Sequence, residues 1–230
     1  MARWGMVIDL DRCDGCQACA VACKAENNLP VTSPDEEVPG RDMAWLNVEE
    51  VTTGTFPNVK RRFMPRMCQH CDDPPCIRVC PVRATYKNHE GLVAQVYSRC
   101  IGCRYCTMAC PYTAKFFNWA TPEWDAESTK CWNPDVSIRP KGVVEKCTFC
   151  HHRLQQARDL ARAEGRDLRP GEYTPACVQS CPSGSMVFGD LDDPTTEVAK
   201  LSKSSRAFRV NEDLGTHPKV FYLTEGEWHG

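Results

Sequence analysis

The chain has 230 residues, a mass of 25.9 kDa and a formal net charge of −2. Hydrophobic residues make up 42% of it and charged residues 25%, which is typical of a folded globular protein and excludes a disordered chain. Its scattered basic residues do not favour nucleic-acid binding, and without an apolar run of about 18 residues or a secretory leader we expect neither a membrane span nor an export signal.

Seventeen cysteines set this sequence apart. Random placement gives roughly one pair at any given spacing, whereas this chain holds six C-x-x-C pairs and four C-x-x-x-C pairs. Sixteen of the cysteines form four groups: Cys13, Cys16, Cys19 and Cys23; Cys68, Cys71, Cys76 and Cys80; Cys100, Cys103, Cys106 and Cys110; and Cys147, Cys150, Cys177 and Cys181. Cys131 lies outside these groups.

The first group follows a predicted strand at residues 6–9 and is followed by Lys24, where each of the other groups is followed by proline. Prolines after it predict a loop over residues 27–40. Strand-like stretches at 45–51 and 60–64 then predict a hairpin around a turn.

The third group, from Cys100 to Pro111, reproduces the complete C-x₂-C-x₂-C-x₃-C-P run of bacterial ferredoxins. The second group is a variant with four residues between its second and third cysteines. Only 19 residues separate the two groups. These residues predict two strands, at 84–86 and 92–96, joined by a turn.

The fourth group is split by 26 residues between its second and third cysteines. A helix is predicted inside this split, at residues 151–164. Its expected apolar face consists of Leu154, Ala157, Leu160 and Ala161. The remaining expected elements are a strand at 184–189, a short helix at 195–202 and a strand at 220–223.

Three thiols at three-residue spacing match three corners of an iron–sulfur cube, and the fourth cysteine of such a run ligates the neighbouring cluster. The four groups therefore predict four [4Fe–4S] clusters. Disulfides usually tie distant segments, and zinc sites use separated pairs of cysteines, so both explain the pattern less well. Because sixteen cysteines saturate four clusters, we do not expect Cys131, His70, His151 or His152 as ligands.

Groups two and three are close enough in sequence to exchange their fourth cysteines within one module, and groups one and four then pair across the chain. We number the predicted sites as follows: site 1, Cys13, Cys16, Cys19 and Cys181; site 2, Cys23, Cys147, Cys150 and Cys177; site 3, Cys68, Cys71, Cys76 and Cys110; site 4, Cys80, Cys100, Cys103 and Cys106. Sequential pairing, of group one with two and three with four, stays open.

The expected fold is α+β, with two nested ferredoxin-like βαββαβ modules that hold two clusters each. The outer module is discontinuous and the inner one is continuous. The predicted boundaries are 1–26 with 140–190 for the outer module, 65–118 for the inner module, 27–64 for a hairpin insert, 151–176 for a helical insert and 191–230 for a C-terminal extension.

Basic side chains adjoin the cysteines in sequence: Arg12, Lys24, Arg78, Arg83, Arg99, Arg104 and Lys146. A cysteine-ligated [4Fe–4S] cluster carries a charge of about −2 when oxidised, so a nearby cation would raise its reduction potential. Ordinary solvated surface charge is an equally good interpretation for any one of these residues.

Taken together, the four groups resemble the four-cluster electron-transfer subunits of the dimethyl sulfoxide reductase superfamily, such as those of polysulfide, thiosulfate and dimethyl sulfoxide reductases. The resemblance rests on residues 6–9 before Cys13, on residues 68–81, 100–106 and 145–150, and on 177–190. The stretch 192–223 is also similar to the iron–sulfur part of alternative complex III. The resemblance implies the same nested pairing of the groups.

The resemblance further implies a subunit without a catalytic site, which carries electrons between a molybdopterin-dependent (molybdenum or tungsten) catalytic subunit and a polytopic, quinone-binding membrane subunit. We expect a peripheral protein attached to the membrane through its partners, with the periplasmic side, reached by co-export, favoured over the cytoplasmic side. The alternatives are an iron–sulfur subunit of a hydrogenase or formate dehydrogenase, a freestanding polyferredoxin, and a zinc-binding structural module.

Overall fold

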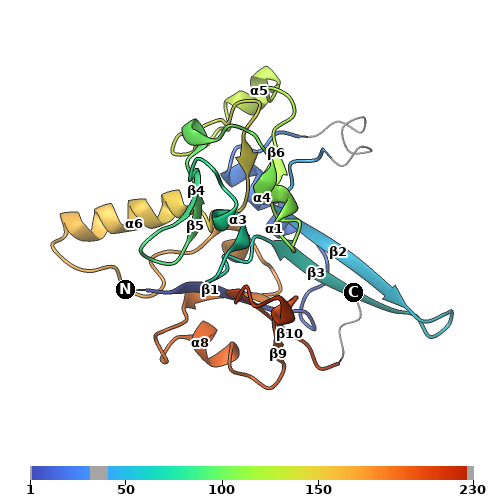
Figure 1. The fold of residues 1–230 in the computed structure, drawn as a ribbon. Coiled ribbons are helices and arrows are strands. Elements are labelled where there is room, and N and C mark those ends of the chain that lie inside the picture. Colours follow the sequence, from blue (N-terminus) through green and yellow to red (C-terminus); the bar gives the residue numbers. More distant parts are fainter. Residues whose placement is uncertain (1, 32–40, 227–230) are drawn as a thin grey trace.

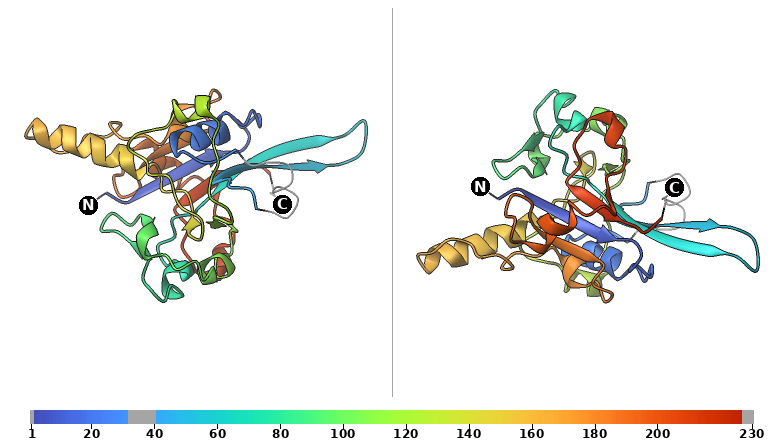
Figure 2. Two further views of the ribbon diagram at one scale, coloured as in Figure 1. Left: turned by 90° about the horizontal axis from the view of Figure 1, so that it is seen from above. Right: turned by 90° about the horizontal axis from the view of Figure 1, so that it is seen from below.

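The computed structural model describes residues 2–31 and 41–226. A four-stranded sheet forms the base, and the chain segment with the second and third cysteine groups lies above it (Figure 1). A hairpin and a long helix project on opposite sides of this body in all views (Figure 2). Part of the loop predicted at 27–40, namely 32–40, lies outside the described residues.

The base sheet joins the two ends of the chain. Its strands are ordered β8 (Met186–Asp190), β1 (Trp4–Asp9), β10 (Val220–Leu223) and β9 (Ala207–Phe208). β1 pairs antiparallel with β8 and parallel with β10. Both faces of β1 are covered: Met6 and Ile8 belong to the main core, whereas Val7 packs in a second apolar cluster on the other face. β1 is therefore an almost continuous apolar run.

Short helices carry five of the nine buried cysteines. They are α1 (Ala18–Glu26), α3 (Pro75–Arg78), α4 (Tyr105–Met108) and α7 (Ala176–Gln179). α1 has nine residues and the other three have four each. Proline after the last cysteine cannot continue a helix. Lys24 imposes no such limit, so α1 runs on to Glu26.

The central segment contains the predicted hairpin, formed by β4 (Thr85–Lys87) and β5 (Val93–Gln95), followed by the 3₁₀ turn η1 (Tyr97–Arg99). β6 (Phe116–Phe117) then pairs with β7 (Val144–Glu145), and α5 (Ala126–Thr129) lies in the loop between them. The helices α3 and α4 pack together, as α1 and α7 do. Each pair brings two cysteine groups to one place.

The strands that enclose each helix pair differ. β1 before α1 pairs with β8 after α7, as a ferredoxin unit requires. β3 (Lys60–Met67) before α3 pairs instead with β2 (Leu46–Thr53), which confirms the predicted hairpin. β2 thus takes the place beside β3 that β6 has in a simple ferredoxin, and β6 pairs with β7.

The predicted helix in the split fourth group is α6 (His151–Ala163). Leu154 and Ala161 are buried, but Leu160 is 66% exposed, so its expected position on the apolar face was wrong. Leu160 is six residues after Leu154, which at 3.6 residues per turn turns it about 120° away from that face. α6 ends at Ala163, and Gly165, two residues later, has a left-handed backbone conformation with φ 67°.

The C-terminal extension is part of the core. It contains α8 (Glu197–Leu201), β9, the 3₁₀ turn η2 (Glu212–Leu214) and β10. Residues 216–219 run beside the second cysteine group, where Asp72 N–H donates to His217 O at 2.9 Å and Lys219 N–H donates to Gln69 O at 2.9 Å. Sequence reasoning did not predict this cover. In the part of the chain that the structure describes, no helix has the length and apolarity to cross a membrane.

Candidate iron–sulfur sites

All four cysteine loops share one backbone feature. The residue before the second cysteine has a left-handed conformation in each: Gly15 (φ 72°), His70 (φ 44°), Gly102 (φ 69°) and Phe149 (φ 54°). A left-handed residue reverses the direction of the backbone within the loop. It lets the two thiols of a C-x-x-C pair face the same space.

Site 2 draws its cysteines from the two ends of the chain. Cys23 of α1 is buried, and the thiols of Cys147, Cys177 and Cys150 lie around it. Burial first, and then the negative charge of these three neighbours, raises the pKa of Cys23 well above its usual range. Asn27 Nδ2 lies 3.7 Å from Cys23 Sγ and 4.0 Å from Cys150 Sγ. This cluster of four thiols joins cysteine group one to group four.

Site 1 joins the same two groups. Burial, then the charges of Cys13 and Cys181 among others, raises the pKa of Cys19 to about 11. At Cys181, burial acts in the same direction, but hydrogen bonds from Ser185, Ser183 and the backbone outweigh it and lower the pKa. Cys16 belongs to the same loop and is exposed.

Site 3 is a small cavity. Cys68, Cys71, Cys76 and Cys110 all line it, together with Lys115 and Tyr112. Burial raises the pKa of Cys71 to about 12, and a hydrogen bond with Thr216 of the C-terminal extension opposes this rise. A cavity whose wall contains four thiols from two loops suits one polynuclear cluster.

Site 4 brings Cys80 to the third group. The negative charges of Cys100 and Cys80 act on Cys106, whose pKa is raised mainly by burial. Cys80 accepts a hydrogen bond from Ala84 N–H at 3.2 Å. Such backbone bonds to Cys80 outweigh the effect of burial, so its pKa is lowered. Cys103, in the same loop, is exposed.

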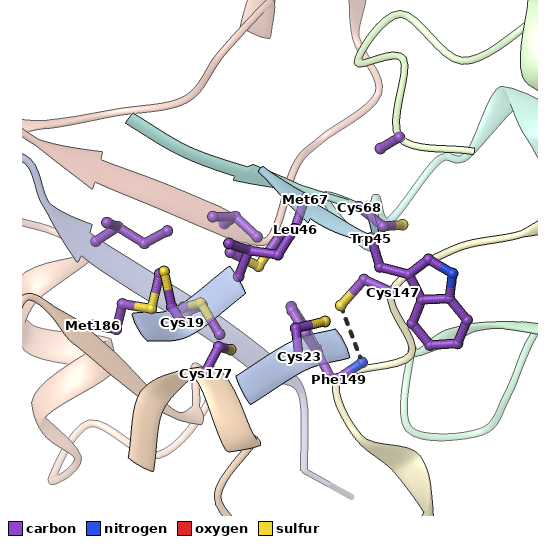
Figure 3. Packing of buried hydrophobic residues seen from close by; sticks show 14 of the residues in the cluster. Cys19, Cys23, Trp45, Leu46, Met67, Cys68, Cys147, Phe149, Cys177 and Met186 are labelled. Atoms are coloured by element: carbon purple, nitrogen blue, oxygen red, sulfur yellow. Dashed lines mark hydrogen bonds between the residues drawn. The ribbon is translucent and has the colours of Figure 1, made fainter. Parts of the chain in front are cut away.

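The four sites follow one another in the order 1, 2, 3, 4. The charge of Cys19 of site 1 acts on Cys177 of site 2, and the charge of Cys68 of site 3 acts on Cys147 of site 2. Figure 3 shows Cys19, Cys177, Cys23, Cys147 and Cys68 along the buried core. Lys115 adjoins both site 3 and site 4.

Several backbone N–H groups point at the sulfurs. Val144 N–H donates to Cys100 Sγ at 3.4 Å, Phe149 N–H to Cys147 Sγ at 3.4 Å (Figure 3), and Ala176 N–H to Cys150 Sγ at 3.5 Å. Hydrogen bonds of this kind stabilise thiolates and tune the potentials of iron–sulfur clusters. The backbone N–H groups are therefore placed to stabilise these cysteines as thiolate ligands.

The remaining thiol and the imidazoles have other surroundings. Cys131 is exposed and belongs to none of the four cysteine sites. His70 Nδ1 accepts a hydrogen bond from Val93 N–H at 3.2 Å, and His152 Nε2 lies 2.6 Å from Glu26 Oε1. Burial lowers the pKa of His151. These contacts give no reason to assign any of the three histidines as a ligand.

The thiol arrangement also bears on disulfides and zinc. All seventeen cysteines lie within the described chain and are free thiols. Among the described residues, no three His, Cys, Asp or Glu side chains are arranged to hold a single metal ion. Thiolates around a four-iron cube lie farther apart than thiolates around one zinc ion. Each of the four predicted sites draws its thiols from two cysteine groups, as paired ferredoxin loops do.

The structure separates the cations that sequence reasoning had grouped. Lys146 is completely buried, whereas Lys24 is partly exposed and pairs with Asp42 at 3.2 Å. Arg78 lies at the surface and pairs with Asp73. Sequence reasoning missed Lys115, which is 7% exposed, because it adjoins no cysteine in the sequence. Only the fold brings it to two sites.

Comparison with known protein families agrees with this chemistry. Residues 59–135 and residues 12–84 each match a 4Fe-4S dicluster domain. The match at 12–84 covers groups one and two, which are neighbours in sequence, although in the folded chain group one meets group four. The fold and the loops thus define a ferredoxin-type electron-transfer protein with four [4Fe–4S] clusters.

Whole-chain relatives define the family. The chain is 53% identical to the iron–sulfur cluster-binding subunit of menaquinone reductase from Nitratidesulfovibrio vulgaris, over 98% of this chain and 90% of the relative. It is 39% identical to the iron–sulfur subunit of an arsenate respiratory reductase from Shewanella sp., over 96% of both chains. It is 37% identical to an iron–sulfur subunit of an Hdr-like menaquinol oxidoreductase from Archaeoglobus fulgidus, over 97% of this chain and 84% of the relative. The chain belongs to the iron–sulfur subunits of the dimethyl sulfoxide reductase family, which transfer electrons and do not themselves catalyse the substrate reaction.

Proposed function

We propose that the sixteen grouped cysteines hold the four [4Fe–4S] clusters as sites 1 to 4, within the nested outer and inner modules predicted from the sequence. The main support is the gathering of Cys147, Cys150 and Cys177 around Cys23. Sequential pairing would instead require the fourth cysteine of group one to adjoin group two. Bound clusters supply one-electron chemistry, and the protein sets their spacing, exposure and charge.

The clusters form one path through the chain, with sites 1 and 4 at its ends. Each end site has one exposed cysteine, Cys16 or Cys103, whereas all four cysteines of site 2 are buried. Large apolar side chains surround Cys103: Ile101 is 64% exposed, Tyr105 62% and Met108 84%. Exposed apolar side chains beside a redox site support a protein interface at that end of the path.

The partners are a molybdopterin-dependent catalytic subunit and a polytopic membrane subunit that binds quinone. This chain is similar to the iron–sulfur subunits of a menaquinone reductase and of an arsenate respiratory reductase, and the first of these names states a quinone. The apolar surface near Cys103 supports permanent partners and disfavours a freestanding polyferredoxin. Full-length similarity to reductase subunits likewise disfavours the hydrogenase and formate dehydrogenase alternatives.

The protein is peripheral to a membrane-associated complex, and we propose the periplasmic side as its location. A chain that has already received its clusters would cross the membrane folded, together with its catalytic partner. Protease treatment of spheroplasts tests this, with a cytoplasmic iron–sulfur enzyme as control. Digestion of this chain alone supports the periplasmic side, and equal protection of both proteins contradicts it.

The central experiment is purification of the intact complex from its native membrane without oxygen, followed by iron, molybdenum and tungsten analysis. We expect about sixteen irons on this chain, a molybdopterin subunit and a polytopic membrane protein. The same iron on a lone soluble chain would make it a polyferredoxin. Zinc in place of iron would make it a structural module.

Two cysteine variants test the ligand sets. Cys110→Ser should remove the electron paramagnetic resonance signal of site 3, or about four irons, and leave site 4 intact. Cys181→Ser should affect site 1, and an effect at site 3 instead would favour another pairing. Cys131→Ser is the matched control, because Cys131 is exposed and apart from the sites.

A further inference from the structure

We propose that two buried lysines, Lys115 and Lys146, are fixed positive charges at the junctions between neighbouring cluster sites, where each stabilises an electron on either of its two sites. This inference rests on the proposed function, because it requires clusters at sites 2, 3 and 4. The two residues are called the junction lysines below.

Lys115 lies between sites 3 and 4. Lys115 comes five residues after Cys110 in the sequence. It lines the cavity of site 3. Its Nζ donates to Thr85 Oγ1 at 2.9 Å and to Gln95 Oε1 at 3.4 Å, so the β4–β5 hairpin holds it in place. Burial raises the pKa of both Cys76 of site 3 and Cys106 of site 4, and at each thiol the Lys115 charge is the largest opposing influence.

Lys146 lies between sites 2 and 3. It is completely buried directly before Cys147, and its Nζ donates to Cys147 O at 2.7 Å. Its positive charge acts on Cys147 of site 2 and also on Cys76 of site 3. The imidazole of His70, next to Cys71, is close enough that the Lys146 charge contributes to lowering its pKa, after burial.

The junction lysines differ from other lysines in what balances their charge. Among the described residues, no carboxylate forms an ion pair with Lys115 or Lys146. The equally buried Lys219 has Asp72 at 3.6 Å, and Lys24 has Asp42 at 3.2 Å. A buried ammonium without a counter-charge is strongly unfavourable. Thiolate-ligated clusters on both sides would supply that counter-charge.

The position between two sites has a specific consequence. When one electron leaves site 3 and reduces site 4, the summed charge of the two sites is unchanged. Lys115 faces both, so it favours the reduced form of each and does not hold the electron at one. Removal of its charge should therefore lower both potentials together. A lysine that served a single site would shift that site alone.

The test is a redox titration of the intact complex, followed by electron paramagnetic resonance, with signals assigned through the cysteine variants above. In Lys115→Met, the ratio of reduced to oxidised cluster at a fixed potential should fall about tenfold at sites 3 and 4, equivalent to about 59 mV for one electron. Lys146→Met should produce the same fall at sites 2 and 3. Site 1 should change less than twofold in both.

Three further variants separate charge from packing. Lys115→Arg keeps the charge and should retain the wild-type potentials. Lys115→Gln keeps a hydrogen-bond donor and should show the same fall as Lys115→Met, which covers the case in which methionine disturbs folding. Lys24→Met removes a cation next to Cys23 that is already paired with Asp42, so it should leave all four potentials within twofold.

The outcomes are distinct for the two proposals. A wild-type complex without four cluster signals would refute the proposed function. Four signals whose potentials do not change in Lys115→Gln and Lys146→Met would refute the inference alone. A shift confined to one site, or an equal shift in Lys115→Arg, would also overturn it, because neither follows from a shared charge.

Discussion

The two central cysteine loops and the two end loops have the same backbone turn but use different residues to make it. At the left-handed position before the second cysteine, the end loops of sites 1 and 4 have Gly15 and Gly102, and the central loops of sites 2 and 3 have Phe149 and His70. A non-glycine residue with positive φ is uncommon. The central side chains must therefore contribute something that glycine cannot.

Their contribution is packing between two sites. The rings of His70 and Phe149 stack with centroids 3.9 Å apart and an interplanar angle of 20°. Both side chains are buried.

In the end loops this position lies against another segment of the protein. A Cβ on Gly102 would be 2.3 Å from Gly142 O. At Gly15 the close neighbour is the Phe63 ring, 2.4 Å from a Cβ. The same turn thus allows close approach of a neighbouring group at the ends and provides side-chain packing in the centre.

Removal of the Phe149 ring should have the largest effect on stability of the changes that test this comparison. Phe149→Ala should lower the free energy of unfolding by about 3–5 kcal/mol, because a large buried side chain is deleted from a packed core. Chemical denaturation of the cluster-loaded protein measures this change. Tyr105→Ala, at an exposed position of the site 4 loop, is the control and should cost less than about 0.5 kcal/mol. Equal losses would contradict the comparison.

Substitution of Arg139, near the centre, should cost more unfolding free energy than substitution of Arg104, near the site 4 end. Arg139 pairs with Glu145 at 3.0 Å, with both side chains at most 2% exposed. Arg139→Met should cost about 3–5 kcal/mol, since a buried carboxylate loses its partner. Arg104, which lies 4.7 Å from the Trp119 ring near site 4, should cost about 0.5–1 kcal/mol when replaced by methionine.

The Arg139 variant should also depend on pH. Burial raises the pKa of Glu145, and the Arg139 charge opposes the rise. Without Arg139 the pKa rises further, so the folded state takes up a proton more readily than the unfolded state. Stability that depends on this proton is present in acid and is lost as the pH rises through the folded-state pKa. Denaturation should therefore show a smaller deficit at about pH 5 than at about pH 8.

At the end of the path, Gly102→Ala tests the close backbone contact. Left-handed alanine alone costs about 1–2 kcal/mol, and the contact with Gly142 O should add to this. Gly142→Ala is a matched control, because Gly142 has φ +89° and a Cβ there would meet nothing within 4 Å. Similar losses of unfolding free energy in the two variants would show that the contact does not matter.

The smallest effect is expected at Cys131. Replacement by serine should leave iron content unchanged and change the free energy of unfolding by no more than about 0.5 kcal/mol. Iron analysis beside denaturation checks both. Loss of about four irons would make Cys131 a ligand and contradict the assignment of four complete sites.

Much of this architecture could be predicted from local sequence. The spacing of the cysteines carries the loop geometry, and proline after the last cysteine of three groups ends α3, α4 and α7 after four residues. Alternation and turn residues were sufficient for the β2–β3 and β4–β5 hairpins. These features depend on residues close together in the chain.

Features that depend on distant segments could not be predicted in this way. Lys115 adjoins two sites because the β4–β5 hairpin holds it there, and no local pattern marks it. The stacking of His70 on Phe149 joins loops that are far apart in sequence. Leu160 is a separate case, because its exposure follows from its position on α6, about 120° around the helix from the buried Leu154.

The arrangement of the base sheet has a consequence for synthesis. β1 is made before every other described strand, and both of its neighbours, β8 and β10, are made much later. At 5–20 residues per second, its apolar side chains wait roughly 10–40 s for β10. Until β8 is made, nascent β1 is an unpaired hydrophobic strand, and this gives a chaperone a reason to bind it early in synthesis.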